Sequence, residues 1–193
     1  MLLFDFRGHG KSGGKHSSIG YKERRDLYAA VRYVKSRPEV DPERIGVIGV
    51  SMGAATAILT AAECAAIKAV VADSSFATLR DVVYQGFRNT FKLPGPVVAG
   101  PLMMFSEMFS GFRASQVRPI DVVNLIAPRP IMFIHSQADQ LINYSHCDRL
   151  FEAAAEPKSR WLVADASHAR AGELYYDEYM ARVNDFFEQN LSA

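Results

Sequence analysis

RIGVIGVSMGAATAILTAAE, residues 44–63, is the stretch that decides the fold of this chain. Its apolar run Ile45–Val50 predicts a buried strand. The alanine-rich stretch Ala54–Ala65 predicts a helix, because alanine is the strongest helix former. The motif Gly49-Val50-Ser51-Met52-Gly53 leaves no room for a loop between the expected strand and the expected helix. We therefore expect Ser51 in a tight turn between strand and helix, where small neighbours let the two backbones pass closely.

The same G-x-S-x-G spacing occurs a second time, as Gly10-Lys11-Ser12-Gly13-Gly14. Ser12 lies several residues beyond the apolar run that precedes it, and no helix pattern begins before about Gly20. Only Ser51 has a strand directly before it and a helix directly after it. Ser51 is therefore the candidate nucleophile, and Ser12 is interpreted as a residue of a flexible turn.

Short apolar runs alternate with helical patterns, which predicts βαβ units around a parallel sheet. The runs are almost wholly apolar, as expected for strands that are covered on both faces. The expected strands are Leu2–Phe6, Ile45–Val50, Ile67–Ala72, Ile131–His135 and Trp161–Ala164. The expected helices are residues 20–36, Ala54–Ala65, Ser145–Ala155 and Tyr176–Leu191. We expect one α/β domain over residues 1–193, with about five strands in a mostly parallel sheet.

The composition is that of an ordinary globular protein, with 49% hydrophobic and 22% charged residues and a net charge of +1. No basic stripe favours nucleic acid or an anionic lipid surface. Cys64 and Cys147 predict free thiols in a reducing compartment, hence a cytoplasmic protein. Asp5 and Arg7 interrupt the first apolar run, so it is not a signal peptide. Three prolines and Glu107 interrupt residues 93–109, which excludes a membrane span there.

A nucleophilic serine needs a base, and the base needs an orienting acid. Asp139 follows one expected strand and His168 follows the next, so both belong at the carboxyl edge of the sheet. Asp73 and Asp165 are the competing acids, since the first ends a strand and the second lies close to His168.

The other four histidines, His9, His16, His135 and His146, are interpreted as structural or exposed. No metal-binding spacing is present, and Lys11-Ser12 lacks the first glycine of a phosphate-binding loop. We expect no metal and no cofactor.

Residues 76–118 break the alternation and are too long for a plain loop. Their apolar content predicts short helices in an inserted cap or lid. Met103, Phe105 and Phe109, with Met104, are candidates for an acyl pocket, although buried residues of the cap core are equally expected there.

These residues together resemble the α/β-hydrolase superfamily, and within it the serine esterases and peptidase-like hydrolases related to the Bem46 group. The resemblance covers essentially the whole chain, from "FDFRGHGKS" through "RIGVIGVSMGAA" and "RPIDVVNLIAPRPIMFIHSQADQLI" to "ADASHA". It implies a three-layer fold and a Ser51–His168–Asp139 triad. Ser136 and Asn143 depart from the family pattern, which usually has glycine and proline there.

The resemblance also implies that the first three strands and the first helix of the family are missing. The vacant place beside Ile45–Val50 would then be filled by Leu2–Phe6 through a right-handed crossover. The lost helix would leave apolar side chains uncovered on one face of the sheet, so we expect a homodimer or a higher homo-oligomer that covers this face. Met52 would supply one oxyanion donor through its amide, and His9 or Gly8 the second, unless that loop only forms a tight strand exit.

The expected reaction is cleavage of a small-molecule carboxylic ester through an acyl-enzyme. The same triad serves thioesters, amides and peptides, so those substrates stay open. Two other hypotheses remain open. The chain could be an inactive truncated hydrolase that acts only as a binding or structural protein, or a relative of the cofactor-free peroxidases or dehalogenases.

Overall fold

The computed structural model describes residues 1–92 and 95–192, without the side chains at 90, 95, 98, 106, 109 and 110. Four parallel strands form one sheet in the order β1 (Ile45–Val50), β2 (Ile67–Asp73), β3 (Ile131–Ser136) and β4 (Lys158–Val163). These four lie within a few residues of their predicted positions. Each neighbouring pair is parallel, so every strand points the same way. All four carboxyl ends therefore meet at one edge.

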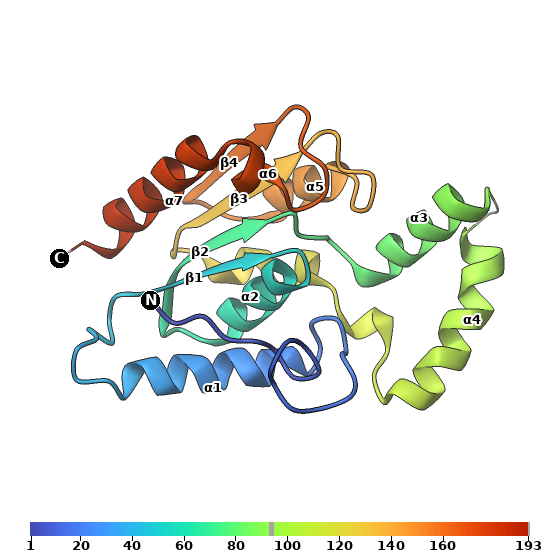
Figure 1. Ribbon diagram of the computed structural model, residues 1–193, viewed down its shortest axis with the longest axis horizontal. Helices are drawn as coiled ribbons and strands as arrows, with labels where there is room; N and C mark the ends of the chain where they lie inside the picture. Colours follow the sequence, from blue (N-terminus) through green and yellow to red (C-terminus); the bar gives the residue numbers. More distant parts are fainter. Residues whose placement is uncertain (93–94, 193) are drawn as a thin grey trace.

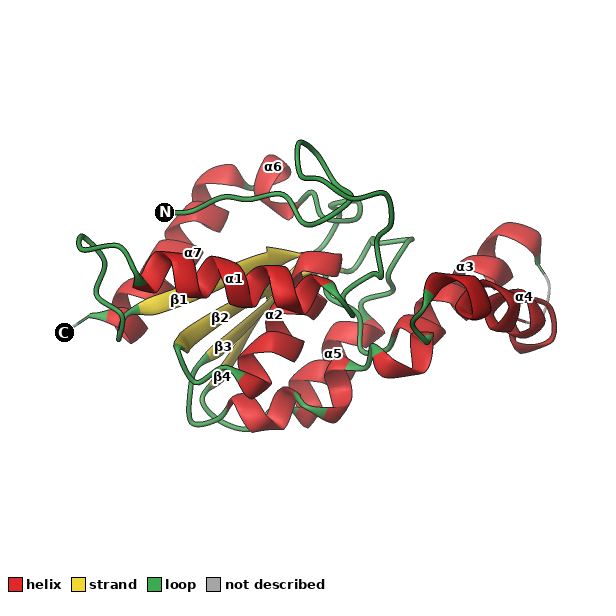
Figure 2. Ribbon diagram, turned by 90° about the horizontal axis from the view of Figure 1, so that it is seen from below, coloured by secondary structure: helices red, strands yellow, loops and turns green. Residues whose placement is uncertain are grey.

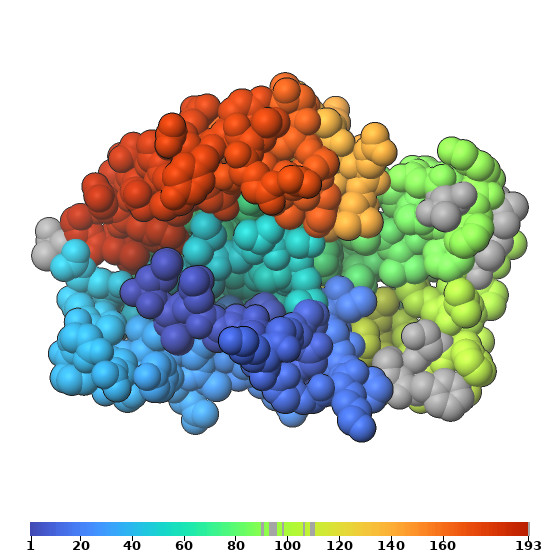
Figure 3. Space-filling view, viewed as in Figure 1, coloured from blue at the N-terminus to red at the C-terminus, as the bar shows by residue number. Residues whose placement is uncertain are grey.

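The predicted fifth strand, Leu2–Phe6, is wrong, because these residues form no strand and do not pair with β1. The amide and guanidinium of Arg7 bind Asp26 on α1 (Glu23–Lys35) at 2.9–3.1 Å. Phe6 packs near the start of α2 (Met52–Glu63) and against the core of the helix layer. These contacts hold the segment beside the helices. Figure 3 shows it on the surface in dark blue, next to cyan residues.

Two layers of helix cover the two faces of the sheet, as Figure 1 shows. One face packs on α1, α2 and α5 (Ser145–Ala153), and the other packs on α7 (Tyr176–Leu191). The alternation along β2 explains this division, since Val70 and Ala72 belong to the first core and Ala69 and Val71 to the second. Both faces of the strand are buried, which is why residues 69–72 are all apolar.

The segment between β2 and β3 contains α3 (Leu79–Phe91) and α4 (Gly95–Ser110), followed by three short 3₁₀ helices. Figures 1 and 2 show α3 and α4 projecting beyond the end of the sheet. Thr78 caps α3 by accepting a hydrogen bond from the amide of Asp81 at 3.1 Å. A small apolar cluster that includes Phe76, Leu79 and Val117 joins the base of this arm to the domain.

The remaining helix of the described residues is the one-turn α6 (Ala171–Leu174), which precedes α7. No helix in the described part of the chain is long and apolar enough to cross a membrane.

Candidate active site

Ser51 occupies a strained turn between β1 and α2, as the sequence predicts. Its φ is +55°, in a region that side-chain-bearing residues seldom adopt. The turn needs glycine at position 49, since a Cβ there would lie 2.3 Å from the carbonyl oxygen of Gly53. The amide of Ser51 donates to the carbonyl of Asp73 at 2.8 Å and so fixes the turn to β2. The hydroxyl is thereby presented at the carboxyl edge of the sheet.

Two loops bring His168 and Asp139 to this hydroxyl. The Nε2 atom of His168 lies 2.8 Å from the Oγ of Ser51, and its Nδ1 atom lies 2.7 Å from the Oδ2 of Asp139. An ionised carboxylate only accepts hydrogen bonds, so Nδ1 carries the proton. Nε2 is then free to accept the proton of the serine hydroxyl. The structure thus joins the three predicted residues in one chain of hydrogen bonds.

Asp139 is buried and saturated with hydrogen bonds. Its Oδ1 accepts the amides of Leu141 and Ile142, each at 2.9 Å. Burial alone would raise the pKa of this carboxyl, but the hydrogen bonds from His135, His168 and Ile142 outweigh burial and hold the pKa below its usual value. Asp139 therefore stays ionised throughout the neutral range.

His135 is a contact of this carboxylate that the sequence interpretation overlooked. Its ring is fully buried, with Nε2 at 2.9 Å from the carbonyl of Ile142 and 3.4 Å from the Oδ2 of Asp139. A carbonyl oxygen can only accept, so Nε2 carries a proton that also faces Asp139. The only feature of the sequence that could have suggested this contact is that His135 and Asp139 are four residues apart.

The two competing acids are held elsewhere. Asp73 accepts hydrogen bonds from Ser74 at 2.8 Å and from Tyr179 at 3.0 Å, which ties β2 to α7. Burial raises the pKa of Asp73, although these hydrogen bonds oppose the rise. Asp165 is exposed and accepts a hydrogen bond from Tyr175. Of the three carboxylates, Asp139 is the one hydrogen-bonded to His168.

The two predicted oxyanion donors differ in their surroundings. Met52 is the first residue of α2, and the first amides of a helix have no acceptor within the helix. The amides of His9 and Gly8 donate to the carbonyls of Phe6 and Gly13, both at 3.0 Å. Ser12 donates its hydroxyl to the carbonyl of Asp5 at 2.6 Å. These bonds close the loop on itself, although no strand precedes it as the interpretation of a tight strand exit had assumed.

The candidates for an acyl pocket lie on α4. Met103 packs against the small cluster at the base of the arm, whereas Phe105 is largely exposed. The side chain of Phe109 lies outside the described residues. A cavity of about 440 Å³ opens between α3 and α5, and neither Met103 nor Phe105 lines it.

The other histidines divide as the sequence interpretation expects. His9 and His16 are exposed. His146 is buried, and its Nδ1 accepts the amide of Ala77 at 3.1 Å. Among the described residues, no group of three His, Cys, Asp or Glu side chains is placed to hold a metal ion.

His146 predicts a loss of stability in mild acid. Burial, helped by Arg149 and His135 and opposed by Asp81 and Asp139, lowers its pKa from 6.5 to about 4. Because the folded-state pKa is the lower one, the unfolded chain takes up the proton first. This contribution is therefore complete above pH 6.5 and is lost as the pH falls toward 4. From this residue alone we expect the free energy of unfolding to be about 2 kcal/mol lower at pH 5 than at pH 7.5.

Urea unfolding of the wild type and of His146→Asn at both pH values measures this effect. Asparagine keeps an acceptor near the amide of Ala77 but does not titrate. The variant should therefore lose about 2 kcal/mol less than the wild type between the two pH values. An equal loss in both proteins would show that His146 is not the titrating group.

The chain is similar to several known proteins over nearly its whole length. The sequence profile of the prolyl oligopeptidase family matches residues 1–193. YqkD of Bacillus subtilis is 33% identical over 97% of this chain and 62% of its own length. YfhR of Escherichia coli K12 is 29% identical over 96% of this chain and 59% of its own length. This chain therefore spans about three fifths of these curated relatives.

Among solved structures, the Pyrococcus furiosus esterase Pf2001 superposes with a TM-score of 0.77 at 34% sequence identity. The superposition covers 97% of this chain and 69% of the esterase.

Proposed function

Since the chain belongs to the prolyl oligopeptidase family, we propose that it is a serine hydrolase that cleaves small carboxylic esters through an acyl-enzyme. One observation carries the proposal: the Oγ of Ser51 lies 2.8 Å from a histidine nitrogen whose partner nitrogen is bonded to an ionised, buried carboxylate. This arrangement activates a hydroxyl for acyl transfer.

In the proposed mechanism Ser51 attacks the ester carbonyl while Nε2 of His168 takes its proton. The imidazolium that forms is stabilised by Asp139, whose carboxylate is fixed in place by the amides of Leu141 and Ile142. His168 then gives the proton to the departing alkoxide, which leaves Ser51 acylated. In the second half of the reaction, water attacks the acyl-enzyme while His168 takes its proton. His168 then returns this proton to the Oγ of Ser51, and the carboxylic acid is released.

The oxyanion of each tetrahedral intermediate requires donors at the turn. The amide of Met52 is the proposed first donor because it begins α2, next to the nucleophile. Gly8 and His9 use their amides within their own loop, so we do not assign the second donor to them. Loss of one such donor typically costs about 10²–10³-fold in kcat, which leaves substantial turnover with one donor.

An ester is favoured over a peptide because Pf2001, which is 34% identical, is an esterase. The family name points to peptide bonds instead, so an amide substrate is the second candidate. We place small esters first because an alkoxide leaves more easily than an amine and asks less of an oxyanion site with one assigned donor.

Pre-steady-state hydrolysis of p-nitrophenyl butyrate tests the acyl-enzyme route. We expect a burst of p-nitrophenol close to one equivalent per protein, followed by slower turnover, because this activated ester acylates the serine faster than water removes the acyl group. The matched p-nitroanilide should react far more slowly. Faster anilide than ester cleavage would favour a peptidase, and no turnover of either compound would favour a non-catalytic binding role.

We further propose a location in the reducing cytoplasm, where the two free cysteines would stay reduced. We also propose that copies of the chain assemble there through the open edge of the sheet. Support comes from β1, which is an edge strand whose Ile48 and Val50 remain 40% and 42% exposed. Leu3 and Phe4 add further exposed apolar surface. Apolar strand edges of this kind favour association. Light scattering at micromolar concentration should report a dimer or larger species, and a monomer would contradict the proposal.

We also propose that α3 and α4 act as a cap over substrate. Val97, Met104 and Met108 lie on one side of α4 and are exposed, so this apolar stripe is available to contact an acyl chain.

A further inference from the structure

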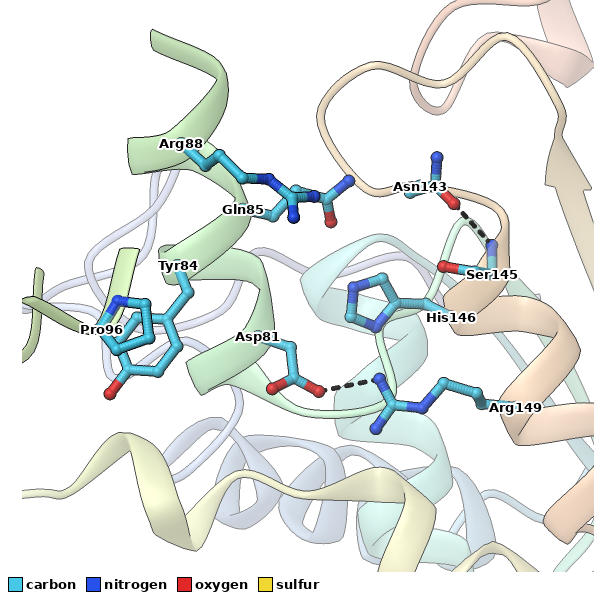
Figure 4. Close-up of a pocket in the computed structure, with 9 residues that line it drawn as sticks. All are labelled: Asp81, Tyr84, Gln85, Arg88, Pro96, Asn143, Ser145, His146 and Arg149. Carbon is cyan, nitrogen blue, oxygen red and sulfur yellow. Dashed lines mark hydrogen bonds and ion pairs between the residues drawn. The ribbon is translucent and has the colours of Figure 1, made fainter. Parts of the chain in front are cut away.

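The cavity between α3 and α5 contains none of the three residues of the proposed triad. Its volume is about 440 Å³, the size of a small-molecule site. Residues of α3 form one wall, and the start of α5 with the loop before it forms the other, as Figure 4 shows. The cavity adjoins the loop of Asp139, since Asn143 in its wall is four residues further along the chain.

His146 presents a fixed hydrogen-bond donor to this cavity. Its Nδ1 accepts the amide of Ala77, so the neutral ring must carry its proton on Nε2. Burial lowers the pKa of His146 to about 4, which keeps the ring neutral at physiological pH. The residue is only 3% exposed, and it lines the cavity. No partner for Nε2 is found among the described residues. This donor is therefore preorganised for a ligand.

The charges in the cavity leave one positive charge uncompensated. Asp81 binds Arg149 at 2.8 Å, so these two charges neutralise each other. Arg88, on α3 two turns beyond Asp81, lines the same cavity, and the described residues offer it no carboxylate partner. In Figure 4 its guanidinium extends from α3 toward Asn143 and Ser145 on the opposite wall. The electrostatic preference is thus for an anion.

The opposite wall supplies further donors. Asn143 accepts the amide of Ser145 on its Oδ1 at 3.0 Å, which leaves its side-chain NH₂ as a donor. Ser145 adds a hydroxyl, and the N-terminus of α5 adds partial positive charge. Asn143 stands where the resembling family commonly has proline, and proline would supply no side-chain donor. Tyr84 and Pro96 contribute carbon surface to the same cavity.

We propose that this cavity is a binding site for a small organic carboxylate, whose oxygens are held by Arg88, the Nε2–H of His146 and the NH₂ of Asn143. A planar carboxylate matches the paired donors of a guanidinium, and the aliphatic part of the ligand lies against Tyr84 and Pro96. The proposal is independent of catalysis at Ser51, since no residue of the triad lines the cavity.

Isothermal titration with succinate tests the site without requiring turnover. Wild-type protein and Ser51→Ala should bind succinate equally and saturably, because Ser51 is outside the cavity. Arg88→Gln should weaken binding by about tenfold or more, the expected effect of losing a charge-assisted hydrogen bond. Arg80→Gln is the matched control, since Arg80 is an exposed arginine of the same helix that does not line the cavity.

Succinamide and inorganic phosphate complete the experiment. Succinamide has the same length without charge and should not bind measurably. Phosphate binding tighter than succinate would reassign the site to phosphorylated ligands and overturn the carboxylate assignment. Equal weakening by Arg88→Gln and Arg80→Gln, or no saturable binding by the wild type, would overturn the site itself. Circular dichroism melting of each variant establishes that all compared proteins are folded.

Discussion

Asp139→Asn is expected to lower kcat for p-nitrophenyl butyrate by about 10⁴-fold while KM changes little, by analogy with other Ser–His–Asp arrangements. The variant keeps one oxygen to accept the amides of Leu141 and Ile142, so the loop should stay in place. Its NH₂ group then faces Nδ1 of His168. An amide nitrogen donates, so Nδ1 must become the acceptor and Nε2 must carry the proton. In that tautomer His168 cannot take the proton of Ser51.

Asp165→Asn is the matched control for this result. Asp165 is the competing carboxylate closest to His168 in the sequence, but it is exposed and bound to Tyr175. We expect kcat within about threefold of the wild type, since exposed polar contacts contribute little. A large loss of kcat in Asp165→Asn together with a small loss in Asp139→Asn would show that Asp165, and not Asp139, orients His168.

Gly49→Ala is expected to destabilise the protein by about 3 kcal/mol, at the upper end of the usual cost of overpacking, and the variant should also lose hydrolase activity. The added Cβ would lie 2.3 Å from the carbonyl oxygen of Gly53 and 2.7 Å from the amide nitrogen of Ala54. Both atoms belong to the backbone of the turn and the first helical residues, so neither can rotate away. Relief requires β1 and α2 to separate, which displaces Ser51.

Gly86→Ala provides the comparison for this substitution. Gly86 lies in α3, and a Cβ added there meets no atom within 4 Å. This variant should be as stable as the wild type or more stable by about 0.5–1 kcal/mol, because alanine is the better helix former. Urea unfolding monitored by circular dichroism measures both variants. Wild-type stability in Gly49→Ala would contradict the close packing of the turn.

The sequence predicted those parts of the fold that depend on local pattern. Apolar runs at Ile45–Val50 and Ile67–Ala72 identified two strands, of which the second is buried on both faces and the first lies at the open edge of the sheet. The rule that parallel strands end at a common edge brought Ser51, Asp139 and His168 together before any distance was known. Each of these inferences needs only the identity and order of neighbouring elements.

The failures came from contacts that local pattern does not contain. Leu2–Phe6 is as apolar as the true strands, but the binding of Arg7 by Asp26 on α1 holds it beside the helix layer. The second contact of Asp139, with His135, depends on how the ring rotates inside the core. The cavity joins Arg88 of α3 to His146 of α5, which are far apart in the sequence and meet only through the packing of the arm.

Labelling with a fluorophosphonate tests the central claim, that Ser51 is an activated nucleophile. The purified protein would be treated with the probe, and the modified residue located by peptide mass spectrometry, with Ser51→Ala as the control. The account predicts modification at Ser51, none in the variant, and strongly reduced labelling when Asp139 is replaced by asparagine. A folded protein that is not labelled, or that is labelled at another serine such as Ser12, would contradict it.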